Sequence, residues 1–100
     1  METNQLTKEH ILKFLRKNKD FFKKKFDVDA IILFGSYARD EATEDSDVDI
    51  LIDTEKKSFD NRFELKELLE KEFKKKVDLL YKDSIRRFIM KNIKEELIYA

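Results

Sequence analysis

Residues 29–53 read DAIILFGSYARDEATEDSDVDILID, and this stretch decides the fold. It holds two short apolar runs, 29–35 and 47–53, separated by a polar and acidic segment without periodicity. Short apolar runs with branched side chains predict buried strands. The first run ends at Gly35, the single glycine of the chain. Glycine serves where the backbone turns sharply or approaches a ligand closely, although it can also merely end a strand.

Helical spacing of apolar residues appears on both sides of these strands. Residues 7–26 predict a helix with Thr7 as N-cap, and residues 60–75 predict a second helix with Asp60 as candidate cap. Residues 77–81 predict a third strand, and residues 84–99 a last amphipathic helix. The residues expected to face inward from the second helix are Phe63, Leu65, Leu68, Leu69 and Phe73.

This order predicts a single domain over residues 1–100 of the α/β (α+β) class. We expect a small mixed three-stranded sheet covered by helices. A helix joins the second and third strands, which favours parallel pairing between them. A loop joins the first two strands, so these could run antiparallel.

The composition limits which kinds of binding site the chain can form. The chain has no cysteine and one histidine, which excludes disulfides and the usual zinc sites, so any metal must bind oxygen ligands, as magnesium does. The 22 basic and 22 acidic residues balance, so direct nucleic-acid binding through bulk charge is not expected. The lysine runs 23–25 and 74–76 are typical of solvated helix ends. No signal peptide or membrane-spanning run is evident, and we expect a soluble, cytoplasmic protein.

Three aspartates are candidate metal ligands. Asp47 and Asp49 alternate along the second strand, so they share one face, where two carboxylates repel unless a cation lies between them. Asp78 interrupts an apolar strand, which is costly unless it is paired or metal-bound. If the strands are neighbours, the three carboxylates suit a two-metal site for displacement at phosphorus. The alternatives are solvent-facing edge positions, or an ion pair of Asp78 with Lys75 or Lys76.

The Gly35-Ser36 pair supplies a candidate anion site. A strand that ends in glycine, followed by a serine that opens a helical turn, directs backbone N–H groups outward. Arg39 could reach a phosphate, or it could pair with Asp40 or Glu41. No Gly-Lys-Ser/Thr sequence is present, so a Walker-type NTPase is not expected.

Residues 34–39, FGSYAR, followed after the acidic loop by Asp47-Val48-Asp49, resemble the signature of the polymerase-beta-type nucleotidyltransferase superfamily. More narrowly, the chain resembles the minimal nucleotidyltransferases, short prokaryotic proteins often paired with HEPN-domain partners. The resemblance covers nearly the whole chain, and Asp78 sits where that family carries its third carboxylate. One departure is Asp40, which stands where the family often has glycine and adds negative charge beside an anionic substrate.

The resemblance implies the nucleotidyltransferase fold and a role for each motif residue. Gly35 and Ser36 would hold the triphosphate of ATP, and Arg39 would contact the nucleotide. Asp47 and Asp49 would bind two Mg²⁺ ions. Asp78 would bind the catalytic ion and help deprotonate the attacking hydroxyl.

The resemblance also implies a reaction and a partner. The hydroxyl of a tyrosine on a HEPN-type toxin would receive AMP from ATP, pyrophosphate would be released, and the protein would act as an antitoxin. Two alternatives stay open. One is an antitoxin that neutralises its partner by contact alone, and the other is a transferase acting on RNA or a small molecule.

Overall fold

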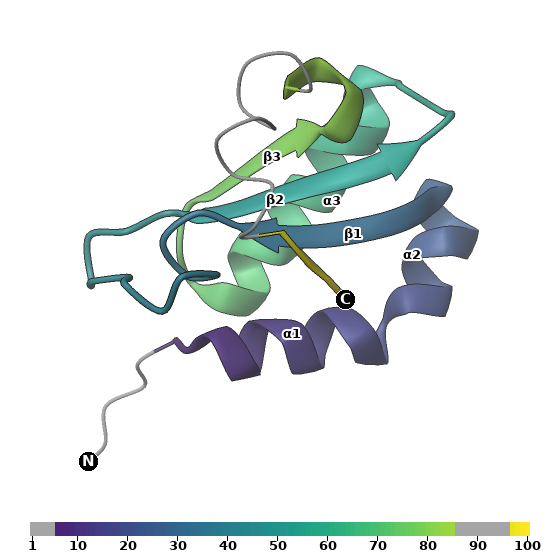
Figure 1. Cartoon of the computed structure of the whole chain (residues 1–100). Coiled ribbons are helices and arrows are strands. Elements are labelled where there is room, and N and C mark those ends of the chain that lie inside the picture. The colour runs from purple at the N-terminus through teal and green to yellow at the C-terminus, as the bar shows by residue number, and fades with distance from the viewer. Residues whose placement is uncertain (1–5, 86–96) are drawn as a thin grey trace.

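The protein is described by a computed structural model that covers residues 6–85 and 97–100. The helices in this part of the chain are α1 (Lys8–Lys17), α2 (Lys19–Phe26), α3 (Phe59–Phe73) and the short 3-10 helix η1 (Lys82–Ile85). The strands are β1 (Val28–Phe34), β2 (Val48–Thr54), β3 (Val77–Tyr81) and β4 (Ile98–Tyr99). The mixed α/β class predicted from the sequence is confirmed, with four strands rather than three (Figure 1).

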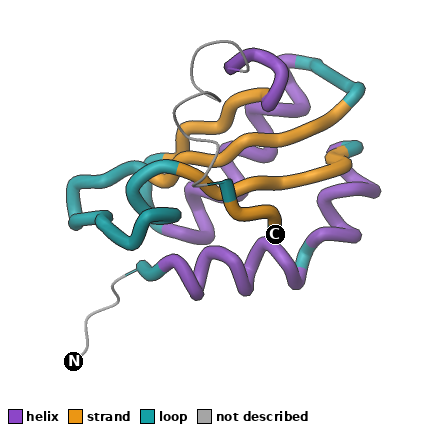
Figure 2. The backbone as a smooth tube through the Cα atoms, viewed as in Figure 1, coloured by secondary structure: helices purple, strands orange, loops and turns teal. Residues whose placement is uncertain are grey.

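The sheet has the order β3-β2-β1-β4. β2 pairs antiparallel with β1 and parallel with β3, so both predicted pairings are confirmed. As a result, the end of β1 and the beginnings of β2 and β3 lie together at the same end of the strands (Figure 1). The long loop 35–47 also lies at this end of the sheet (Figure 2).

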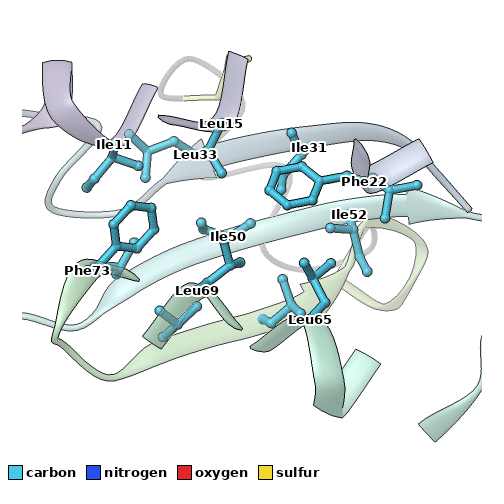
Figure 3. Packing of buried hydrophobic residues seen from close by; sticks show 14 of the residues in the cluster. Ile11, Leu15, Phe22, Ile31, Leu33, Ile50, Ile52, Leu65, Leu69 and Phe73 are labelled. Atoms are coloured by element: carbon cyan, nitrogen blue, oxygen red, sulfur yellow. The ribbon is translucent and has the colours of Figure 1, made fainter. Parts of the chain in front are cut away.

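The three α-helices cover one face of the sheet. Ile11 and Leu15 from α1, Phe22 from α2 and Leu65 and Leu69 from α3 pack with the helix-facing strand residues in one buried cluster (Figure 3). Along β2 the members of this cluster are Val48, Ile50 and Ile52. A smaller cluster of Ile32, Phe34 and Leu51 lies on the opposite face, as the alternation of side chains along a strand requires.

The helix predicted over residues 7–26 is broken at Asn18, and the prediction of one continuous helix is wrong. The Asn18 side chain donates a hydrogen bond to the Phe14 carbonyl at 2.8 Å, the acceptor that also receives the Asn18 backbone N–H at 3.2 Å. Asparagine side chains compete with helix backbone in this way and favour helix ends. The predicted N-cap at Thr7 is confirmed, since its side chain accepts from the His10 amide.

Two details of α3 differ from the prediction. The N-cap is Ser58, whose hydroxyl accepts from the Asn61 amide at 3.2 Å, and Asp60 lies in the first turn instead. Phe63 does not face inward: its side chain is 46% exposed and stacks on Phe59. Leu65, Leu69 and Phe73 are buried as expected.

The C-terminal prediction is partly wrong. Residues 98 and 99 form a strand that pairs with β1, with Ile32 opposite Tyr99, and the Ala100 amide donates to the Ile31 carbonyl at 3.0 Å. Branched and aromatic residues favour strands, and this pairing covers part of an exposed strand edge. Most of the predicted last helix, residues 86–96, lies outside the described residues. Within the described ranges, no helix is long and apolar enough to cross a membrane.

Candidate active site

The register of the sheet aligns two of the three candidate carboxylates. Phe34 is the partner of Asp49 across the antiparallel pair, and Asp49 is the partner of Asp78 across the parallel pair. Directly paired residues place their side chains on the same face of a sheet. Asp49 and Asp78 therefore lie side by side on the face opposite the helices, next to the end of β1.

Gly35 lies directly against Asp49. Its φ of +79° is in the left-handed region that side chains rarely adopt. A Cβ built at this position would strike the Asp49 carboxylate oxygen and would stand 3.0 Å from Asp49 Cγ. The glycine is thus required twice, by its backbone angle and by the close approach of the turn to the carboxylate.

The turn after Gly35 leaves amide groups available for an anion. Its hydrogen bonds use the amides of Arg39, Asp40 and Glu41 as donors, to the carbonyls of Gly35, Tyr37 and Ser36. The amides of residues 36–38 have no acceptor among the residues that the structure describes. Consecutive N–H groups in a turn of this kind form a concave site for phosphate or carboxylate. The segment is a turn without a regular helix.

The three aspartates differ in exposure. Asp47, immediately before β2, and Asp49 are half-buried, whereas Asp78 is exposed on the edge strand β3. Of the alternatives left open by the sequence, Asp78 therefore occupies the solvent-facing edge position, and its placement beside Asp49 is confirmed. In the described ranges, no group of three or more His, Cys, Asp or Glu side chains is arranged to hold a metal ion.

Two residues of the turn have defined partners. The Arg39 Nε donates to Glu41 at 3.0 Å, so of the alternatives left open by the sequence the structure contains the pair with Glu41. Both side chains are largely exposed, and exposed pairs of this kind contribute at most about 1 kcal/mol. Tyr37 is 5% exposed and belongs to the helix-side core, where it anchors the turn.

The acidic loop is anchored by Lys75, a contact that the sequence did not predict. The Lys75 Nζ donates to the carbonyl of Glu44 at 2.6 Å and to that of Ser46 at 3.1 Å. The run 74–76 is typical of a solvated helix end, and nothing in its sequence distinguishes the middle lysine. In the structure Lys75 is half-buried, and both neighbouring lysines are exposed.

An open cavity of about 850 Å³ lies behind the loop. Tyr37, Thr43, Glu44, Phe73 and Lys75 are among its lining residues. Tyr37 and Phe73 belong to the helix-side core, so the cavity opens on the other side of the loop from Asp49 and Asp78.

Comparison with known families gives a match over most of the chain. The family model described as "Nucleotidyltransferase domain" matches residues 15–100. The "Putative protein adenylyltransferase MJ1379" of Methanocaldococcus jannaschii is 46% identical over 98 residues, which cover 94% of this chain and 98% of the relative. The "Protein adenylyltransferase MntA" of Thermococcus cleftensis is 43% identical over 96 residues, 95% of this chain and 97% of the relative.

Solved structures share the fold. One described as a "putative minimal nucleotidyltransferase" superposes with a TM-score of 0.76 at 24% identity, over 96% of this chain and 98% of the other. A crystal structure of a "toxin-antitoxin with AMP-PNP" gives a TM-score of 0.55 at 31% identity, over 76% of this chain and 57% of the other.

Proposed function

Because the chain belongs to the nucleotidyltransferase domain family, we propose that it transfers AMP from ATP to a tyrosine hydroxyl of a HEPN-type toxin and thereby acts as an antitoxin. The observation that carries the proposal is the register of the sheet, which sets Asp49 beside Asp78 and against the Gly35 turn. Carboxylates and a phosphate-binding turn at one edge are what transfer of a nucleotide requires.

The donor set of the site fits magnesium. Asp47, Asp49 and Asp78 offer only oxygen ligands, which Mg²⁺ prefers. Mg²⁺ is usually held by one or two carboxylates together with water and substrate phosphates, so a preformed cage of three carboxylates is not needed. When bound, two such ions would neutralise phosphate charge and polarise the reacting oxygens.

The proposed reaction is a displacement at the α-phosphorus of ATP. The acceptor oxygen forms a bond to the α-phosphorus, the bond from that phosphorus to the bridging oxygen breaks, and pyrophosphate leaves. Asp78, which is exposed, accepts the proton of the attacking hydroxyl. The amides of residues 36–38 and the Ser36 hydroxyl bind the triphosphate, and Arg39 would exchange Glu41 for a phosphate oxygen.

A protein acceptor is supported by the relatives and by the shape of the site. Relatives of nearly the same length are named protein adenylyltransferases, and a similar fold occurs in a toxin–antitoxin structure with AMP-PNP, an analogue of ATP. Asp78 is exposed, so a second protein could present its hydroxyl there. Because the proposed reaction uses ATP, we propose that it takes place in the cytoplasm.

The test is transfer from α-labelled ATP with Mg²⁺ to protein and RNA of a lysate from the source organism. We expect label on one discrete protein, and a decrease of at least about 100-fold for Asp49→Asn, the scale of losing one charge-stabilising group. Asp53→Asn is the matched control, because Asp53 lies on the same strand and face and is also half-buried. It should transfer normally.

Other outcomes would select an alternative. Label on RNA would indicate a transferase acting on nucleic acid. Absence of label, together with toxin neutralisation that survives Asp49→Asn, would indicate an antitoxin that works by contact alone. Circular dichroism of both variants would establish that they are folded.

A further inference from the structure

We propose that Lys75 is a positioning residue that fixes Asp47 for metal binding by holding the acidic loop against the start of β3. The inference rests on the proposed function for its catalytic consequence, but not for the anchoring itself. Three features carry it: the contacts of the ammonium group, the rigidity of the segment that bears it, and the internal structure of the loop.

The ammonium group binds two carbonyls that flank one residue of the loop. Lys75 Nζ lies 2.6 Å from the Glu44 oxygen and 3.1 Å from the Ser46 oxygen. Ser46 directly precedes Asp47, so the second bond restrains the peptide group that joins them. Hydrogen bonds from a charged donor are about twice as strong as neutral ones, and two of them from one group also fix an orientation.

The segment that carries Lys75 is held on both sides. The Lys74 amide donates to the Glu70 carbonyl at 2.8 Å, and the Val77 amide donates to the Glu70 carboxylate at 2.9 Å. The Val48 amide donates to the Lys76 carbonyl at 2.9 Å, which joins the segment to the beginning of β2. The backbone at Lys75 is therefore held in place, and the length of its side chain determines where the loop lies.

Residues 43–46 of the loop form a turn with its own hydrogen bonds. The Ser46 amide donates to the Thr43 carbonyl at 3.0 Å, and the Thr43 amide donates to the Ser46 hydroxyl at 2.9 Å. The Asp45 amide donates to the Thr43 hydroxyl at 3.2 Å. Since the turn satisfies these groups itself, the carbonyls of Glu44 and Ser46 point outward to Lys75. Loss of Lys75 would release the turn and Asp47 with it.

The first experiment measures the anchor without any activity. Amide hydrogen exchange is compared for wild type, Lys75→Met and Lys75→Arg, with Lys76→Met as control for loss of one exposed lysine. We expect faster exchange at residues 43–47 in Lys75→Met alone, with the remaining amides unchanged. Lys75→Arg should restore protection, because a guanidinium can donate to both carbonyls. Unchanged exchange in Lys75→Met would overturn the proposal.

The second experiment measures Mn²⁺ binding by calorimetry, with Mn²⁺ as a probe for the magnesium site. Removal of a group that orients a metal ligand typically weakens metal binding by about 10–100-fold, and we expect this for Lys75→Met. In an Asp47→Asn background the same substitution should have no further effect, because the ligand it positions is gone. An equal loss in both backgrounds would overturn the positioning role.

The two experiments separate the two proposals. If wild-type protein binds Mn²⁺ neither alone nor together with a non-hydrolysable ATP analogue, the proposed function fails, whereas the exchange result still reports whether Lys75 holds the loop. If Lys75→Met weakens ATP binding but leaves loop exchange unchanged, Lys75 contacts the nucleotide directly and the positioning role is wrong. Once transfer activity is measured, a positioning role predicts that Lys75→Met has a lower kcat and a nearly unchanged KM for ATP. Lys75→Arg should restore kcat.

Discussion

Gly35 and Asp49 are the two residues whose contact defines the site. Asp49 is half-buried, and the turn that follows β1 lies against its carboxylate. This contact leaves no room for a side chain at position 35. A backbone turn that approaches a carboxylate so closely also brings its amides near any ion or phosphate that the carboxylate binds.

Gly35→Ala should therefore reduce both stability and transfer. The left-handed backbone costs a residue with a side chain about 1–2 kcal/mol, and the contact with Asp49 adds to it. In an Asp49→Ala background the contacts with the carboxylate disappear, whereas the backbone term and a 3.1 Å contact with the Asp49 Cβ remain. Urea unfolding of the four proteins in this cycle measures the two terms. Equal losses in both backgrounds would contradict the contact as the cause.

Single residues also mark how far the sequence could predict the site. The spacing of Gly35, Asp47 and Asp49 could be read directly, because strand periodicity and glycine geometry are local properties. The anchoring role of Lys75 could not, because it depends on a partner about 30 positions away, and three consecutive lysines look alike in sequence. The sequence also left the exposure of Asp78 open, since an edge strand cannot be distinguished from a central one by composition alone.

At the scale of elements, the corner between α3 and β3 depends on Glu70. Its carboxylate accepts from the Val77 amide at 2.9 Å and from Lys66 at 3.1 Å. The hydrogen bond from the Val77 amide, and to a smaller extent that from Lys66, hold the pKa of Glu70 below its ordinary value. A depressed pKa in the folded state means that the ionised form stabilises the fold.

Glu70→Gln should lower the free energy of unfolding by about 1 kcal/mol near neutral pH. The contribution of the charge is present above the unfolded pKa and is lost as the pH falls through the lower folded pKa. The difference between wild type and variant should therefore shrink on acidification. Urea unfolding from about pH 7 to about pH 3 measures it. Glu67→Gln, on the exposed side of the same helix, is the matched control for loss of one carboxylate.

Helices and strands were predicted correctly where a single local pattern dominates the sequence. β3 has the predicted bounds, and the other long strands differ by one residue at each end. The break at Asn18 was missed because apolar spacing continues through it, while a single side-chain hydrogen bond ends the helix. β4 was missed because its two residues form a strand only through the edge that β1 offers, which is a property of the assembled sheet.

The two faces of the sheet carry different kinds of side chain. The helix-covered face holds the main core, and the other carries Asp49 and Asp78 around a small apolar cluster. Which side of α3 faces the core can be tested with two residues about half a turn apart, because Leu65 is fully buried and Phe63 is 46% exposed.

Leu65→Ala should cost about 2–5 kcal/mol, the range for a large side chain deleted from a core. Phe63→Ala should cost less than about 1 kcal/mol although it removes more atoms, because Phe63 is 46% exposed and its ring stacks on the exposed Phe59. Urea unfolding at fixed pH measures both. Comparable losses would contradict the orientation of α3 in the structure.

Ligand binding offers a test of the site through the stability of the entire domain. A ligand that binds only the folded state stabilises it by about 2.7 kcal/mol when its concentration is 100 times Kd. We expect Mg²⁺ with a non-hydrolysable ATP analogue to raise Tm of wild type by several degrees, about 4–8 °C per kcal/mol for a domain of this size. Asp49→Asn should lose this shift and Asp53→Asn should keep it, because Asp49 lies against the Gly35 turn, whereas Asp53 lies at the opposite end of β2. An equal shift in both variants would place the nucleotide elsewhere on the protein, with the 850 Å³ cavity beside Tyr37 as the next site to test.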